Sequence, residues 1–206
     1  MVSKKSAPWN KGKSVGQMRP LSREQVQTIK LLLEAEGNKR DLALFSTAID
    51  TMLRATDLLA LTVADVTSHE GQIRDEFMVR QRKTGKGTLV SLTPYIQKVL
   101  AQWIAESHKL PWAPLFTRLR SDPNQEAIKP CQYRTLVKKW VGYARLDPAA
   151  YSSHSLRRTK AALIYDQTRN VEAVRQLLGQ STVSATSAYL GVGQHQALEI
   201  AKQLEM

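Results

Sequence analysis

Six polar side chains interrupt segments that are otherwise apolar and helical in pattern. They are two arginines, a lysine, a histidine, a glutamine and a tyrosine, in the chain order Arg54, Lys83, His154, Arg157, Gln180 and Tyr189. Guanidinium groups bind anions such as phosphate through two parallel hydrogen bonds, and ammonium, imidazole and phenol groups exchange protons. Residues of these types have the chemistry of a site that holds an anion and moves protons around it.

Each of these residues alone also has an ordinary structural explanation. Arg54 can pair with Asp57 or cap a helix, and His154 can simply begin one. Tyr189 fits the core side of an amphipathic helix, and Lys83 fits a solvated Lys-Thr-Gly-Lys turn. Short motifs often match by chance, so only the order of the residues along the chain separates the two explanations.

Several familiar catalytic and metal-binding patterns are missing from the sequence. Gly85-Lys86 lacks the glycine that a phosphate-binding P-loop needs five residues earlier, where Arg80 stands. The four histidines have no cysteine or carboxylate at ligand spacing, so we expect no metal site. There is no G-x-S-x-G elbow of a serine hydrolase, and the single cysteine, Cys131, excludes a disulfide framework.

The charge of the chain indicates a polyanionic partner, and nucleic acid is the commonest one. The 206 residues carry 30 Lys and Arg against 18 Asp and Glu, a formal charge of +12. Half of this excess lies in the first 23 residues, which hold six basic side chains and no acidic one. Residues 1–20 are also rich in Gly, Ser and Pro, so we expect a flexible basic tail there.

A hydrophobic content of 42% is enough for a buried core of one domain. No apolar run approaches the about 18–20 residues that a membrane span requires, and the first residues lack the apolar stretch of a secretory signal. With a single cysteine as well, these features favour a cytoplasmic protein.

Hydrophobic periodicity predicts a mostly helical α+β domain over residues 21–206. Helices are expected at 22–36, where Ser22 and Gln25 have the spacing of a capping box, and at 39–53. A short third helix is expected with Thr56 as its cap, and helical spacing resumes from Pro94. Further helices are expected at 131–145, 155–168, 171–178, 182–190 and 195–205. Between them, 77–82 and 88–92 alternate like the two strands of an antiparallel hairpin with Lys83 at its tip, and 72–74 is a weaker candidate for an edge strand.

The order of the polar residues resembles the catalytic domain of the tyrosine recombinases, the phage integrase family. The resemblance covers about residues 20–206 and rests on the arginine box at 53–61, the lysine hairpin at 81–85, the His-x-x-Arg box at 153–159, and the segment 177–191 that contains the tyrosine. It implies the tyrosine-recombinase catalytic domain fold. It also implies a small integrase without the N-terminal core-binding domain of larger members.

The resemblance also implies a reaction. Tyr189 would attack a DNA phosphorus, form a 3′-phosphotyrosyl link and release a 5′-hydroxyl, without metal, ATP or another cofactor. Arg54 and Arg157 would stabilise the charge on the two non-bridging oxygens. Lys83 would protonate the leaving oxygen, and His154 would assist proton transfer from the tyrosine.

Two further positions receive roles from the same resemblance. Gln180 stands where most members have histidine, and its amide N–H would donate to a phosphate oxygen although it cannot carry a proton. Asp57, one turn after Arg54, would orient that arginine, and a role at the start of a helix is the competing explanation.

The implied partner is double-stranded DNA with paired recognition sites, bound by a homotetramer in the bacterial cytoplasm at the nucleoid. Phosphate contacts are expected from basic side chains of the tail, the hairpin and two helices, namely Lys4, Lys5, Lys11, Lys13, Arg80, Arg82, Lys86, Lys138, Lys139, Arg158 and Lys160. The expected C-terminal helix would dock on a neighbouring subunit or on its own domain.

Two other functions remain open at this point. The chain could be a DNA-binding accessory or regulatory protein on the same scaffold, with weak or no catalysis. It could also relax DNA torsion without exchanging strands, as the related type IB topoisomerases do.

Overall fold

The computed structural model describes residues 18–118, 122 and 126–190. The predicted basic tail, apart from its last three residues, and the helix expected at 195–205 lie outside the described residues. Within them the predicted fold class is confirmed, because helices predominate and the sheet is a small antiparallel one. None of the helices described is long and apolar enough to cross a membrane.

Helix α1 (Arg23–Ala35) begins where the sequence predicts because its first turn is capped by Ser22. Ser22 Oγ accepts a hydrogen bond from the backbone N–H of Gln25 at 3.2 Å, and Gln25 Oε1 accepts one from the backbone N–H of Ser22 at 2.8 Å. This reciprocal pair satisfies N–H groups that the first turn of a helix leaves without intrahelical partners. The helix buries Ile29 and Leu33 against the core.

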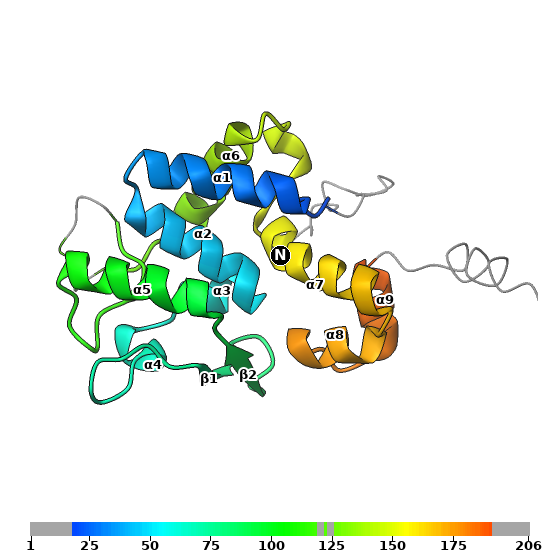
Figure 1. Ribbon diagram of the computed structural model, residues 1–206. Coiled ribbons are helices and arrows are strands. Elements are labelled where there is room, and N and C mark those ends of the chain that lie inside the picture. The colour runs from blue at the N-terminus through cyan, green and yellow to red at the C-terminus, as the bar shows by residue number, and fades with distance from the viewer. Residues whose placement is uncertain (1–17, 119–121, 123–125, 191–206) are drawn as a thin grey trace, which may run out of the picture.

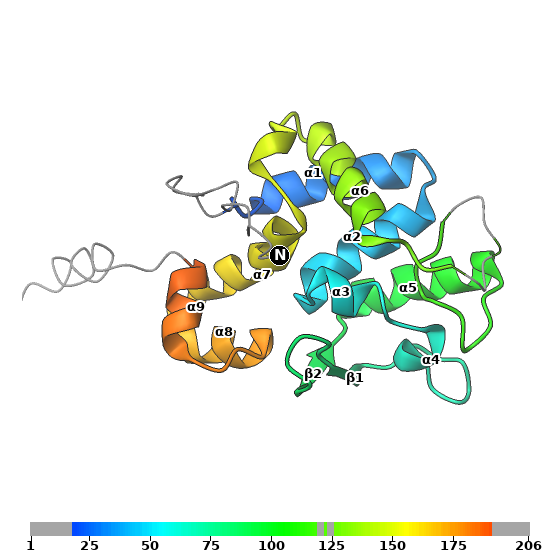
Figure 2. The same cartoon turned by 180° about the vertical axis from the view of Figure 1, so that it is seen from behind.

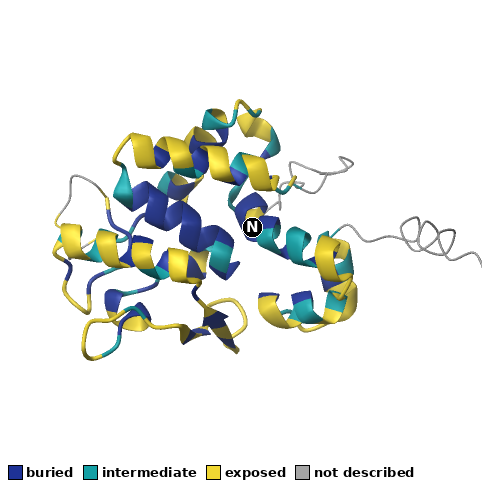
Figure 3. Cartoon of the chain, viewed as in Figure 1, coloured by how far each residue is buried: buried dark blue, intermediate teal, exposed yellow. Residues whose placement is uncertain are grey.

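Helix α2 (Lys39–Thr51) is the centre of the main core, and Figure 3 shows it buried along most of its length. Helices α1 and α5 (Pro94–Ser107) lie beside it, and α6 (Pro130–Tyr143) packs against α1 (Figure 1). Trp140 of α6 is fully buried and donates from Nε1 to Asp41 Oδ2 in α2 at 3.0 Å. The indole thus gives a buried carboxylate the hydrogen bond that its burial requires.

The end of α2 sets the position of Arg54. Met52 takes the left-handed conformation (φ 52°) and ends the helix, and the chain then enters α3 (Ala55–Leu58). Arg54 itself is the N-cap residue of α3, so the expectation that Thr56 caps this helix is wrong. The next short helix, α4 (Val63–Val66), leads toward the hairpin.

The predicted hairpin is formed by β1 (Glu76–Arg80) and β2 (Gly87–Ser91), which pair antiparallel with Val79 opposite Thr88. Every second side chain of both strands is buried. Continuing this alternation by one residue turns Gln81 inward as well, and it is 2% exposed.

The edge strand considered at 72–74 is not formed among the residues described. Thr67 and Ile73 make only an isolated bridge, and the backbone N–H of Arg74 donates to the carbonyl oxygen of Val66 at 2.9 Å. This stretch therefore bonds to the end of α4 and not to β1, so the sheet keeps two strands.

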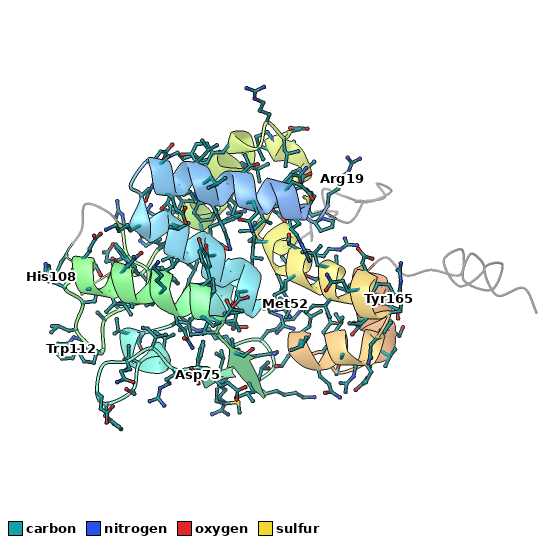
Figure 4. All side chains as sticks on the ribbon, viewed as in Figure 1. Arg19, Met52, Asp75, His108, Trp112 and Tyr165 are labelled. Carbon is teal, nitrogen blue, oxygen red and sulfur yellow. The ribbon has the colours of Figure 1, made fainter. Side chains whose placement is uncertain are left out.

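The last three described helices form a unit at one end of the molecule (Figures 1 and 2). They are α7 (Ser153–Thr168), α8 (Val171–Leu178) and α9 (Val183–Leu190), at the places that the periodicity predicts. They enclose a second, smaller apolar cluster, whose buried members are Met52, Ala161, Tyr165, Val174 and Leu178. Met52, at the end of α2, is the member that the main body contributes (Figure 4).

Candidate active site

Arg54 is held in place by two neighbours. Its Nη1 donates a hydrogen bond to Gln81 Oε1 at 2.5 Å and lies 4.0 Å from Asp57 Oδ2. The side chain of Arg54 is 24% exposed, whereas that of Asp57 is 1% exposed. The guanidinium is therefore fixed on one side and remains accessible on the other.

Asp57 connects this arginine to the hairpin. Its Oδ1 accepts a hydrogen bond from the backbone N–H of Arg82 at 2.9 Å, where the hairpin turn begins. Its Oδ2 is buried, faces Arg54, and accepts no hydrogen bond within the described part of the chain. The carboxylate thus fixes the base of the turn and offsets positive charge beside it, a position compatible with the orienting role expected for it.

Arg157 lies in α7 and is 5% exposed. Its Nη2 donates to the carbonyl oxygen of Leu178, the last residue of α8, at 2.8 Å. Burial, together with the positive charge of Arg54, lowers the pKa of Arg157 to about 10, while Tyr189 and Asp57 act in the opposite direction. The guanidinium remains charged at neutral pH, so two neighbouring cations repel each other in a partly desolvated place.

Tyr189 lies in the last turn of α9. Its hydroxyl is buried beside the Arg157 guanidinium, but no hydrogen bond of good geometry joins it to that group or to any other residue described. Burial raises the pKa of Tyr189, and the nearby cations Arg157, Arg158 and Arg54 act against this rise. The Arg158 guanidinium lies 5.8 Å from the centroid of the phenol ring.

Arg54, Arg157 and Tyr189 therefore lie within electrostatic range of one another, although they come from three separate stretches of the sequence. We call these three residues the arginine–tyrosine cluster. Two repelling guanidiniums favour an anion between them. A buried hydroxyl without a partner is rare in proteins and calls for an explanation other than packing.

Gln180 is hydrogen-bonded to α9, the helix that carries Tyr189. Its Oε1 accepts a hydrogen bond from Oγ1 of Thr186, a fully buried residue of α9, at 2.6 Å. Its backbone oxygen accepts one from Arg175 Nη1 at 2.7 Å. Because the amide oxygen already accepts from Thr186, the N–H groups on Nε2 are the ones that Gln180 can offer to a ligand.

Lys83 and His154 are both exposed, in the hairpin turn and the first turn of α7. The structure records no hydrogen bond or ion pair between either side chain and the arginine–tyrosine cluster, as far as residues are described. His154 and Arg157 share α7, but Arg157 is buried while His154 is not. Their roles in proton transfer stay predictions.

Comparison with known families decides what kind of domain this is. The model named Phage integrase family matches residues 19–195. The chain belongs to the phage integrase family. The assignment that the motifs implied is thereby confirmed.

Curated relatives support the same family. Tyrosine recombinase XerD of Xanthomonas axonopodis pv. citri (strain 306) is 28% identical over 171 residues, which is 76% of this chain and 52% of the relative. The probable integrase/recombinase YoeC of Bacillus subtilis (strain 168) is 25% identical over 171 residues, 83% of this chain and 87% of the relative. The chain thus spans about half the length of the XerD relative and most of YoeC.

Solved structures of recombinases share the fold. The XerH site-specific recombinase bound to palindromic difH substrate, a post-cleavage complex, superposes with a TM-score of 0.70 at 19% identity, over 90% of this chain and 53% of that chain. The XerA recombinase superposes with a TM-score of 0.70 at 19% identity, over 91% of this chain and 66% of that chain. The tyrosine-recombinase catalytic domain fold is confirmed.

The basic residues expected to contact DNA differ in their exposure and in their partners within the protein. Five are exposed, namely Arg80, Arg82, Lys86, Lys138 and Lys139. Four have partners within the protein: Arg80 Nε donates to the carbonyl oxygen of Gly85 at 3.2 Å, Lys160 Nζ lies 2.6 Å from Asp50 Oδ1, Lys139 Nζ lies 3.8 Å from Glu36 Oε2, and Arg158 Nη1 donates to the carbonyl oxygen of Met18 at 3.0 Å. The remaining four, Lys4, Lys5, Lys11 and Lys13, lie outside the described residues.

Sequence reasoning assigned no role to Gln81, although it lies at the centre of the site. Its side chain bonds Arg54, Thr84 and Thr88. The available signal was a polar residue at an inward position of the alternating strand pattern. For metal ligands, the described ranges contain no group of three or more His, Cys, Asp or Glu side chains suited to hold an ion.

Proposed function

We propose that this protein is a site-specific DNA recombinase that cleaves and rejoins double-stranded DNA through a 3′-phosphotyrosyl intermediate. The observation that carries the proposal is the arginine–tyrosine cluster. In it, two guanidiniums repel each other beside a buried phenol hydroxyl that lacks a hydrogen-bond partner among the residues described. A phosphate diester between the arginines would relieve the repulsion and bring its phosphorus to the nucleophile.

The chemistry then follows from the groups present. Tyr189 Oη attacks the phosphorus, a covalent phosphotyrosyl bond forms, and the bond to the 5′-oxygen breaks. Arg54 and Arg157 stabilise the charge that develops on the non-bridging oxygens. The 5′-hydroxyl of a partner strand reverses the step, so the bond energy is conserved and neither ATP nor a metal ion is required.

Proton transfer is assigned to two exposed groups. Lys83, in the hairpin turn, protonates the leaving 5′-oxygen, and His154 assists the loss of the proton from Tyr189. This assistance matters because burial raises the pKa of Tyr189, which makes the phenol a weaker nucleophile at neutral pH. Gln180 donates from Nε2 to a phosphate oxygen.

Paired DNA sites and a tetramer complete the proposal. XerH and lambda integrase have been solved on DNA, the latter as a dimer bound to a COC′ core site. The exposed hairpin residues Arg80, Arg82 and Lys86 surround Lys83 in sequence and supply phosphate contacts, so affinity falls steeply as the salt concentration rises.

Covalent capture tests the proposal. A nicked substrate built from inverted repeats beside the gene loses its 5′-hydroxyl fragment after cleavage, which traps the protein on the DNA as an SDS-stable adduct. We expect an adduct with the unmodified chain, with or without EDTA, and none with Tyr189→Phe. The matched control Tyr165→Phe changes a buried tyrosine of the neighbouring helix and should leave adduct formation intact.

The outcomes separate the competing functions. An adduct with Tyr189→Phe would refute the nucleophile, and loss of the adduct in EDTA would refute the metal-free reaction. Specific binding without any adduct would favour the non-catalytic accessory protein, whose support is Gln180 in place of the usual histidine. Relaxation of a supercoiled plasmid that lacks the repeats would favour the topoisomerase.

A further inference from the structure

Gln81 occupies a buried position at the junction of three parts of the candidate site. It follows β1 directly, is 2% exposed, and forms four side-chain hydrogen bonds. Their partners belong to the start of α3, to the hairpin and to the end of α8. The proposed reaction gives this amide no direct role, because the side chain is almost fully shielded from solvent.

The oxygen of the Gln81 amide accepts hydrogen bonds from the start of α3 and from the hairpin turn. Gln81 Oε1 accepts from Arg54 Nη1 at 2.5 Å and from Thr84 Oγ1 at 2.9 Å. Thr84 directly follows Lys83, so one oxygen atom links the guanidinium that is to bind phosphate with the turn that is to deliver a proton.

The nitrogen of the Gln81 amide donates hydrogen bonds to β2 and to the end of α8. Gln81 Nε2 donates to Thr88 Oγ1 at 2.7 Å and to the carbonyl oxygen of Gly179 at 3.4 Å. Gly179 lies between Leu178, whose carbonyl oxygen accepts from Arg157, and Gln180. A Cβ atom at Gly179 would overlap both Gln81 Nε2 and Thr88 Oγ1, so the contact depends on the glycine.

The chemistry of these bonds selects glutamine. A carboxamide has two acceptor sites on oxygen and two donor hydrogens on nitrogen, and Gln81 uses both of each. Glutamate lacks the donor hydrogens, and methionine, which has a similar length, lacks both the donor hydrogens and the acceptor oxygen. Asparagine has the same amide on a side chain that is one methylene shorter.

We infer that Gln81 is a positioning residue that fixes Arg54 and the Lys83-bearing turn against the Leu178–Gln180 segment. The inference rests on the proposed recombinase function. It requires Gln81 to act through these groups and not through DNA, so its loss should slow the chemical step without weakening DNA binding.

The test measures two quantities for each variant on the nicked substrate: the equilibrium Kd for DNA, and the rate of covalent adduct formation at saturating DNA. For Gln81→Met we expect the rate to fall about 100-fold, the size of effect that a misplacement of about 1 Å produces, with Kd within twofold of the parent. Gln81→Glu keeps the acceptor for Arg54 and Thr84 but loses the donor bonds, so its rate should lie between those of Gln81→Met and the parent. Thermal unfolding of each variant verifies that it is folded.

The control is Gln97→Met, the same substitution at a glutamine of α5. The Nε2 atom of Gln97 donates to Asp75 Oδ1 at 2.7 Å. The rate of this variant should equal that of the parent. A folded Gln81→Met with the parental rate, or with a loss confined to Kd, would overturn the positioning role. Equal rates for Gln81→Glu and Gln81→Met would show that the hydrogen bond from Arg54 to the Gln81 oxygen does not contribute to the rate. A parent chain that forms no adduct would instead refute the proposed function.

Discussion

Arg157 Nη2 donates a hydrogen bond to the carbonyl oxygen of Leu178, 2.8 Å away, at the C-terminus of α8. One edge of the guanidinium thus holds the unit that carries Tyr189, which leaves its other N–H groups for an anion. Carbonyl groups at a helix C-terminus carry partial negative charge, so the contact also stabilises the buried cation.

Replacing Arg157 by lysine should separate charge from geometry. An ammonium keeps the charge but cannot hold the Leu178 oxygen and present a fork of donors to phosphate at once. We expect Arg157→Lys to slow covalent adduct formation at saturating DNA by at least about 100-fold. Arg169→Lys, an exposed exchange at the end of α7, should leave the rate unchanged, and equal rates for the two variants would contradict the assigned role.

The two glycines Gly179 and Gly142 should respond to alanine in opposite directions. Gly179 has φ +59° and no room for a Cβ atom, so Gly179→Ala should lower the free energy of unfolding by more than about 2 kcal/mol. Gly142 is helical with nothing within 4 Å of a built Cβ atom, so Gly142→Ala should raise it by about 1 kcal/mol. Urea denaturation measures both, and a stable Gly179→Ala would show that the Gln81 contact is dispensable for the fold.

Tyr189→Phe should not destabilise the protein. It removes a buried hydroxyl that has no partner within the described residues, so near pH 8 we expect the free energy of unfolding to stay equal or to rise by about 1 kcal/mol. Burial raises the pKa of Tyr189, so the folded chain keeps a proton that the unfolded chain loses near pH 10. The stability contributed by the neutral phenol is present below about pH 10 and is lost as the pH rises beyond it.

The stability difference between Tyr189→Phe and the parent should therefore widen in favour of the variant at high pH. Urea unfolding curves recorded at about pH 8 and about pH 10.5 provide the comparison. A difference that stays constant between these two conditions would show that Tyr189 titrates alike in the folded and unfolded chains.

Asp57→Asn tests the charge balance of the site. Asparagine preserves an oxygen for the backbone N–H of Arg82 but no longer offsets the charges of Arg54 and Arg157. We expect the free energy of unfolding to fall by about 1–3 kcal/mol in urea denaturation. Asp166→Asn breaks an exposed ion pair with Arg169 and should cost less than about 1 kcal/mol. Equal effects of the two variants would exclude the compensating role of Asp57.

Local patterns predicted much of this fold. The capping box of Ser22 and Gln25 gave the start of α1, the run Val171–Leu178 was predicted as α8 to the residue, and alternation identified both strands. These signals succeed because caps and periodicity depend on neighbours in sequence. Thr56 failed as a cap because Met52 ends α2 in the left-handed conformation, and Arg54 takes the N-cap position instead.

The candidate site could be predicted only in part. The order of motifs named the arginine–tyrosine cluster, but not the bonds of Gln81, which join residues up to 98 positions apart. Lys160 and Lys139 stay predicted DNA contacts, but the sequence did not indicate that each lies beside an acidic side chain of another helix. Such pairings depend on tertiary packing, which residue type and local spacing do not encode.

The small apolar cluster beneath α7, α8 and α9 has an energetic consequence. Among the residues described, its five buried members are far fewer than those of the main core, and Met52 is the one supplied from outside this unit. Local opening costs least where the least apolar surface is buried, so backbone amides of α9 should exchange with deuterium sooner than those of α2. We therefore expect the nucleophile to be carried by a part of the domain that opens more readily than the main core, which would let Tyr189 move away from the arginines while the main core stays folded.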